Sequence, residues 1–318
     1  MKYRFVTILH FLKLERPDCR IPLQSGMITN KSDLIGGILN HRSRLALVTL
    51  GTHSIDEFID TTYYLLEGEL DTTWTTEEIN RNGTQMTFAF LRQIQFVTNK
   101  LWLIKDNSVY VRDGFLFVYD EAFDDGLSFK ASMSTVNSLA NTNVQNVVFS
   151  KEDILSVADD MEIISPNSLK EDQQDYKLAT QFQYFKGANI DRKSYAFLYI
   201  LFARSISAIP VKILMYVTAM EALVSTTTIE LSHQVSERVA VLIGNNSEER
   251  KAIYSTIKKA YGFRSKAAHG ESLKGSEDEY KEMLIVIDDY LRRLLKIDEP
   301  YSFDNNKMNT FFLEKLMA

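Results

Sequence analysis

The segment FRSKAAHG at 263–270 holds the residues of this chain that are best suited to catalysis. Arg264 carries a permanent charge on a planar guanidinium that fits phosphate oxygens. His269 titrates near neutral pH and can move a proton as acid or base. Together they form a minimal set for cutting RNA without a metal, because the histidine can assist attack of the ribose 2′-OH while the arginine stabilises the phosphoryl charge. Such a reaction leaves a 2′,3′-cyclic phosphate and spares DNA.

The spacing of this pair sets a geometric condition. In a regular helix, residues at this separation point about 140° apart, so Ser265 rather than Arg264 shares a face with His269. We therefore expect an irregular backbone, since Gly262 and Gly270 bracket the motif, or a site built from two copies about a two-fold axis. The pattern R-x4-H alone has little specificity, and the neighbouring sequence has to supply the rest.

Basic residues surround the motif. Between 250 and 266 the chain has basic side chains at 250, 251, 258, 259, 264 and 266 and no acidic one, although its net charge is −6. The overall acidity argues against a basic nucleic-acid coat, but a local island can hold a phosphate backbone. Lys258, Lys259 and Lys266 are the candidate RNA contacts. The alternative for these lysines is a solvated helix face.

Three segments in order resemble a known family. They are MYVTAMEALVS (215–225), IELSHQVSERVAVLIG (229–244) and FRSKAAHG (263–270). The set is similar to HEPN domains, and within them to the Apea-like branch, over roughly 175–300. The resemblance implies an all-α bundle that dimerises, and in many members a metal-independent RNase of toxin–antitoxin, abortive-infection or other antiphage systems.

The resemblance also assigns roles to single residues. The family signature falls on Arg264 and His269 as the catalytic pair, and Ser265 stands where the family commonly has Asn, Asp or His. Glu221 matches an acidic position near the family's cleft, where it would orient Arg264 or His269. The alternative for Glu221 is an ion pair that locks two helices together. Partners implied are RNA, a second copy of the chain and a regulatory or antitoxin protein.

Other signatures of catalysis are absent from the sequence. There is no phosphate-binding G-x-x-x-x-G-K-[ST] loop, no G-x-G-x-x-G and no H-E-x-x-H, so we expect no cofactor and no metal site. The single cysteine, Cys19, excludes an internal disulfide and favours a reducing compartment. The apolar run at 195–203 is about half of what a membrane span needs. We expect a cytoplasmic protein without a membrane partner.

The pattern of elements predicts an α+β chain with two domains. We expect residues 1–168 to form a mixed α/β domain, for which the resemblance to Apea-like HEPN proteins implies a sensor or regulatory role. Its expected elements are a strand at 4–12, a helical or mixed segment at 54–68, a helix and then a strand in 82–105, β structure at 102–121, and a strand and helix at 144–162 with Ser150 as N-cap. Residues 169–318 read as the HEPN-like helical bundle, with helices at 191–207, 211–225, 229–244, from Asn246 into the motif, from Ser276, and at 305–318.

Three functions remain open at this stage. The leading one is an RNase effector in antiphage defence or abortive infection that uses Arg264 and His269 at a dimer interface. The second is a catalytically inactive module that binds RNA or a nucleotide. The third is a dimeric scaffold in which both residues are only structural.

Overall fold

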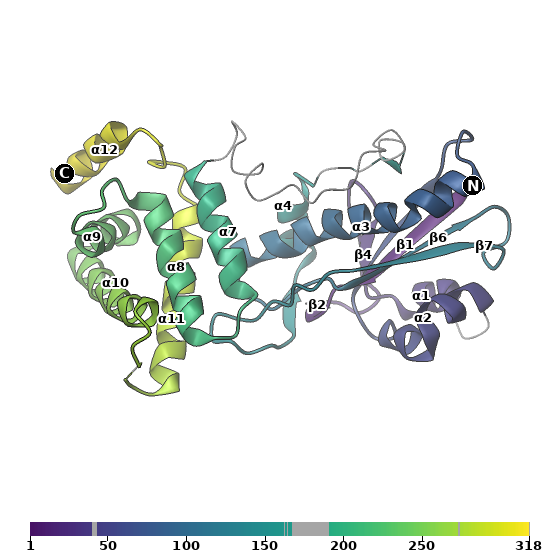
Figure 1. The fold of residues 1–318 in the computed structure, drawn as a ribbon, viewed down its shortest axis with the longest axis horizontal. Coiled ribbons are helices and arrows are strands. Elements are labelled where there is room, and N and C mark those ends of the chain that lie inside the picture. The colour runs from purple at the N-terminus through teal and green to yellow at the C-terminus, as the bar shows by residue number, and fades with distance from the viewer. Residues whose placement is uncertain (40–42, 162, 164, 167–190, 273, 318) are drawn as a thin grey trace. The chain divides into compact units, whose positions relative to one another are not determined.

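The computed structural model describes residues 1–39, 43–161, 163, 165–166, 191–272 and 274–317 (Figure 1). Over these residues the protein is α+β, with a sheet in its N-terminal part and helices in its C-terminal part, as the sequence predicts. The chain forms two compact units. The first unit holds Met1–Trp102, Asn107–Val136 and the described residues of 145–166. The second unit holds Leu103–Asp106, Asn137–Val144 and the described residues from Asp191 on. The predicted boundary at 168/169 lies outside the described residues.

A six-stranded antiparallel sheet forms the centre of the first unit, in the order β3-β4-β5-β1-β6-β7. Strand β1 is central, and its Phe5 lies opposite Leu66 and Leu116 on the two neighbouring strands. A separate parallel pair joins two short strands, β2 and β8. The bounds are β1 Lys2–Ile8, β2 Leu12–Leu14, β3 Arg20–Pro22, β4 Met27–Thr29, β5 Tyr63–Glu69, β6 Asp113–Tyr119, β7 Gly126–Ser132 and β8 Val147–Phe149.

Helices cover both faces of this sheet (Figure 1). Helix α3 (Thr76–Lys100) packs on one face, where Phe90 stacks on Tyr3 with ring centroids 5.6 Å apart. Helices α1 (Ser32–Ile38) and α2 (Arg44–Glu57) pack on the other. Their side chains join Val6 and Phe117 in one buried cluster. Alternating strand residues therefore serve two apolar layers, which accounts for the mixed helix and strand signals of this half.

Some predicted elements of the first unit differ from the observed ones. The segment 54–68 contains the end of α2 and most of β5, because a turn around Asp60, with φ 61°, separates them. The strand expected after 101 is wrong, since Leu101–Leu103 is a 3-10 turn that extends α3. The prediction for 144–162 is confirmed. Ser150 caps α4 (Lys151–Ala158) by accepting from the Asp153 N–H at 3.0 Å.

The second unit is built around helix α8 (Ile209–Val224). Its residues Ile213, Tyr216, Val217, Met220 and Leu223 are fully buried. It contacts four helices, namely α7 (Arg192–Arg204), α9 (Leu231–Ile243), α10 (Ser247–Ala268) and α11 (Glu277–Leu295), while α12 (Asn305–Met317) packs against α9. A helix that is apolar on nearly all sides belongs at the centre of a bundle.

The predicted N-caps Asn246 and Ser276 are confirmed, whereas α8 begins at Ile209 rather than 211 and α9 at Leu231 rather than 229. Asn246 caps α10 by accepting from the Glu249 N–H at 2.9 Å, and Ser276 caps α11 by accepting from the Glu279 N–H at 3.2 Å. Pro210 lies in the first turn of α8, where a missing N–H costs nothing. The Asn246 cap fixes the start of α10, the helix that carries Arg264.

A buried charged network lies inside the second unit. Lys212 is fully buried and donates to Ser138 Oγ at 2.9 Å and to the Leu139 carbonyl at 2.6 Å. On α11, Asp288 accepts from the Tyr216 hydroxyl at 2.8 Å and from Arg292 at 2.7 Å. These bonds bind the segment 137–144 to the helices, because a buried ammonium must keep its partners.

Asp106 belongs to the same network. Its Oδ2 accepts from the Ala140 N–H at 2.9 Å. Burial first, and then the negative charge of Asp288, raises the pKa of Asp106 to about 6. Burial lowers the pKa of Lys212 to about 8. Both shifts disfavour the charged forms, as expected for a dry interior.

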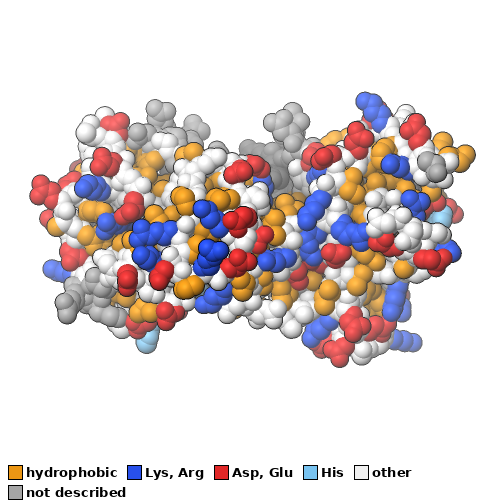
Figure 2. All heavy atoms as spheres, turned by 180° about the vertical axis from the view of Figure 1, so that it is seen from behind, with side chains coloured by type: hydrophobic (Ala, Val, Ile, Leu, Met, Phe, Trp, Pro, Cys, Tyr) orange, Lys and Arg blue, Asp and Glu red, His pale blue; other side chains and the backbone are white. Residues whose placement is uncertain are grey.

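The surface mixes both signs of charge. Figure 2 shows Lys and Arg interleaved with Asp and Glu over one face, which fits a modest net charge of −6. None of the helices in the described part of the chain combines the length and the apolar character that crossing a bilayer requires.

Candidate functional site

Arg264 lies on the side of α10 that faces α8. Its Nη2 is 3.6 Å from Glu221 Oε2, and the Glu221 side chain is only 13% exposed while that of Arg264 is 33% exposed. Of the two partners that the sequence left open for Glu221, the carboxylate thus pairs with Arg264. The contact is an ion pair that is longer than a hydrogen bond and lacks the bidentate geometry of the strongest arginine–carboxylate pairs.

The seam between α8 and α10 holds polar atoms with unused hydrogen-bonding capacity. Glu221 Oε1, the Tyr261 hydroxyl and Arg264 Nε are buried, and none has a hydrogen-bond partner within the described residues. Each such group costs about 1–3 kcal/mol of desolvation. Native proteins keep few of them, and functional sites are among the places where they persist.

His269 is the C-cap residue of α10. Its N–H donates to the Ser265 carbonyl at 3.1 Å, and its φ and ψ of −94° and 5° leave the helical region. Gly270 follows with φ 70°, and the Glu271 N–H reaches back to the Lys266 carbonyl at 2.9 Å. The helix therefore ends in a left-handed glycine turn. An irregular backbone is found at His269 and Gly270, whereas the expectation of one at Gly262 is wrong because α10 runs through it.

One chain does not bring Arg264 and His269 together. His269 is exposed at the end of α10, on the same side as the exposed Ser265, while Arg264 points toward α8. This agrees with the rotation of about 140° that a regular helix imposes. Within the described residues, no hydrogen bond or ion pair joins the two side chains.

The three candidate RNA-binding lysines differ in their surroundings. Lys258 is exposed, with its Nζ 6.0 Å from the centre of the Tyr254 ring. Lys266 is half-buried in the last turn of α10. Lys259 lies 2.6 Å from Glu279 Oε1 on α11. An exposed pair of this kind is weak, yet it leaves Lys259 less available to a phosphate than Lys258.

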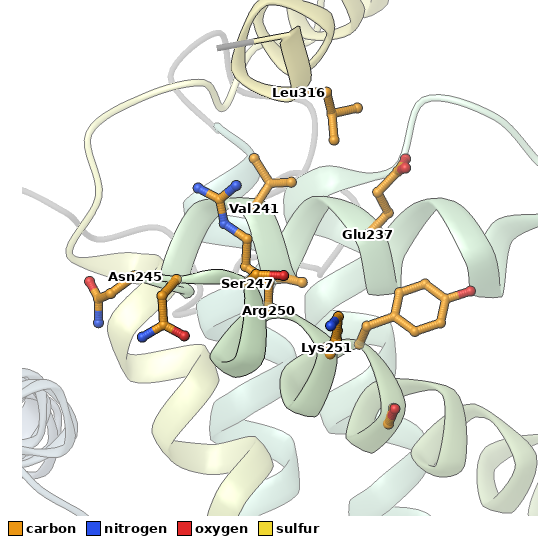
Figure 3. Close-up of a pocket in the computed structure, with 11 residues that line it drawn as sticks. Glu237, Val241, Asn245, Ser247, Arg250, Lys251 and Leu316 are labelled. Atoms are coloured by element: carbon orange, nitrogen blue, oxygen red, sulfur yellow. The ribbon is translucent and has the colours of Figure 1, made fainter.

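A pocket of about 530 Å³ opens at the other end of α10 (Figure 3). Glu237 and Val241 line it from α9, Arg250 and Lys251 from α10, and Leu316 from α12. Arg250 Nε donates to the Gly244 carbonyl at 3.1 Å, and Lys251 lies 3.0 Å from Glu248. Neither Arg264 nor His269 reaches this pocket, so it is separate from the candidate catalytic residues.

Sequence reasoning missed Tyr261 and Lys212. Tyr261 precedes Arg264 by one helical turn, so the 3.6-residue period does place both on one side of α10. The sequence around Lys212 gives no such indication, because lysine is rarely fully buried and a lysine in an apolar helix is usually expected to reach solvent.

Comparison with known proteins adds no relative, because no family model, no curated protein and no solved structure matches the chain. Across the ranges that the structure describes, no three His, Cys, Asp or Glu side chains gather into a possible metal site. The functional argument therefore depends on the residues themselves.

Proposed function

We propose that this chain is a metal-independent endoribonuclease whose site combines Arg264 and His269 from two copies of the chain. The observation that carries the proposal is the arrangement on α10. Arg264 is held loosely by Glu221, with Nη2 and Oε2 3.6 Å apart, and His269 is exposed at the end of the same helix. A loosely held guanidinium can turn to a phosphate, and an exposed imidazole can reach a ribose hydroxyl.

The need for a second copy follows from the geometry. Arg264 and His269 of one chain point about 140° apart, so they cannot close on one phosphate. A two-fold axis near the end of α10 would place His269 of one copy beside Arg264 of the other. The helical bundle would then serve as a HEPN-like dimerisation and catalytic domain, and the sheet-containing unit as its regulator.

The order of the three sequence motifs supports the same function. The helices that carry them, α8, α9 and α10, pack on one another. The resemblance to Apea-like HEPN domains then suggests an effector of antiphage defence or abortive infection, in the cytoplasm. Its partners would be RNA and a regulatory or antitoxin protein.

Single-stranded RNA and EDTA provide the test. We expect the purified chain to cut RNA to products with 2′,3′-cyclic phosphate ends and to leave DNA of the same sequence intact. His269→Ala should abolish cutting, whereas His53→Ala, an exposed histidine of α2 in the other unit, should not. Cutting that survives His269→Ala, or that needs added metal, would exclude this mechanism.

A second candidate function is RNA or nucleotide binding without cleavage. The pocket of about 530 Å³ favours it, since this volume suits a small ligand and Arg250 and Lys251 line it beside Tyr254. Retention of RNA without any products, lost in the double variant Arg250→Ala/Lys251→Ala, would support this function over the first.

A further inference from the structure

The seam between α8 and α10 contains three neighbouring side chains, Glu221, Tyr261 and Arg264, whose hydrogen-bonding groups are not all satisfied. Tyr261 is 8% exposed, and its hydroxyl, Arg264 Nε and Glu221 Oε1 have no hydrogen-bond partner among the described residues. In the part of the chain that the structure describes, the Glu221 carboxylate has one ionic contact, on Oε2. The Tyr261 hydroxyl is close enough to the Glu221 carboxylate for the two to interact, but their geometry is not that of a regular hydrogen bond.

Tyr261 is kept in its donor form. Burial first, and then the negative charge of Glu221 and the hydroxyl's interaction with that carboxylate as an acceptor, raise the pKa of Tyr261 well above its ordinary value. The hydroxyl therefore keeps its proton at any physiological pH. A protonated hydroxyl near a carboxylate can form a charge-assisted hydrogen bond, which is roughly twice as strong as a neutral one.

Glu221 loses its ionic partner when Arg264 turns away to bind a phosphate. A guanidinium that turns to an RNA phosphate withdraws the one ionic partner that Glu221 has among the described residues, from a carboxylate that is 13% exposed. An uncompensated buried charge is costly, and this cost would oppose phosphate binding. A second donor within the seam removes much of it.

We propose that Tyr261 is a positioning residue that donates to Glu221 when Arg264 turns to the RNA phosphate. The inference rests on the proposed ribonuclease function and adds a residue to it. Tyr261 touches neither the substrate nor the reacting atoms. It acts through Glu221, because its hydrogen bond lowers the free-energy cost of moving Arg264 from Glu221 to the phosphate.

A stability measurement tests the exchange without RNA. Arg264→Met removes the guanidinium and keeps an apolar stem, which mimics a departed Arg264. In that background Tyr261→Phe should lower Tm by about 2–4 °C more than it does in the wild type, because the hydroxyl is then the main donor to Glu221. Arg264→Leu, which also lacks a hydrogen-bond donor, serves in the same way if the methionine variant does not fold.

Tyr280→Phe is the matched control for this measurement. Tyr280 is also buried, at 4% exposure, but its hydroxyl donates to the Lys274 carbonyl at 2.6 Å, away from Glu221. Its effect on Tm should be the same with and without Arg264. Equal effects of Tyr261→Phe in the two backgrounds would overturn the proposal.

Cleavage assays then separate this inference from the proposed function. With an active wild type, Tyr261→Phe should lower kcat by about tenfold or more. An active wild type with unchanged kcat in Tyr261→Phe would overturn the role of Tyr261 and leave the ribonuclease in place. A wild type that does not cut RNA would overturn the ribonuclease, and the inference with it.

Discussion

Arg264 and His269 lie on different sides of the same helix end. Arg264 faces α8 and pairs with Glu221 at 3.6 Å, whereas His269 caps α10 and is exposed. A regular helix rotates residues at this separation by about 140° beyond a full turn, and the irregular turn at His269 leaves the two side chains without a hydrogen bond or ion pair between them in the described residues. A site that uses both residues must therefore draw them from two chains.

The first prediction concerns Arg264. Arg264→Ala should lower the rate of RNA cleavage by about 10²–10³-fold, because it removes a charge that stabilises the developing phosphoryl charge. Its Tm should change little, since the pair with Glu221 is 3.6 Å long and the Tyr261 hydroxyl can donate to the carboxylate that Arg264 leaves. Arg81→Ala, an exposed arginine on α3, is the control. Full activity in Arg264→Ala would contradict the assignment.

The second prediction concerns salt. For single-stranded RNA, each phosphate contact contributes about 0.7 to the slope of log binding constant against log salt. Lys258→Ala and Lys266→Ala should each lower the slope by about that amount, and Lys259→Ala by less because Glu279 holds Lys259. Lys281→Ala should leave the slope unchanged, since Lys281 on α11 pairs with Glu277. Equal slopes in all variants would contradict the phosphate contacts and would show that these lysines only form a solvent-exposed helix face.

The sequence predicts the second unit better than the first. Apolar residues on α11 recur at helical spacing, and Asn246 and Ser276 are strong caps, so helix limits there follow from local chemistry. In the first unit the apolar residues do not follow a clear two-residue strand period, because the sheet is covered by helices on both faces. Tyr63 and Leu65 on β5 are buried on one side and Tyr64 on the other, which hides the strand alternation.

Part of the site was also beyond sequence reasoning. The rotation between Arg264 and His269 follows from the helix alone, but Glu221 is more than 40 residues away and its choice of Arg264 over His269 depends on how α8 and α10 pack. The buried Lys212 ammonium is held by hydrogen bonds to segment 137–144, which lies far from α8 in sequence. No local pattern specifies such long-range contacts.

The third prediction concerns Lys212. Lys212→Met should lower the free energy of unfolding by about 3 kcal/mol, because it removes one of the buried cations near Asp106 and Asp288 and takes the hydrogen-bond donor away from Ser138 Oγ and the Leu139 carbonyl. Lys258→Met, at an exposed position on α10, should change it by about 0.5 kcal/mol or less. Denaturant titration of the full chain measures both. A Lys212→Met chain as stable as the wild type would contradict the role given to this network.

The fourth prediction concerns pH. The pKa of Asp106 is about 6 in the folded chain and 3.8 ordinarily, so the folded state holds more protons between these values. Stability contributed by this group is therefore lost as pH rises from about 4 to about 6. Denaturant titration at several pH values measures the free energy of unfolding of wild type and of Asp106→Asn. As pH rises across this window, the free energy of unfolding of the wild type should fall relative to that of Asp106→Asn. A difference that is constant with pH would contradict the raised pKa.

Mixing two inactive variants tests the central claim most directly. Arg264→Ala and His269→Ala, each inactive alone, should regain about one quarter of wild-type cleavage when co-expressed in equal amounts. Half of randomly paired dimers are mixed, and each mixed dimer carries one complete site of two. Activity that stays at the level of the separate variants, beside an active wild type, would contradict a site shared between two copies of the chain.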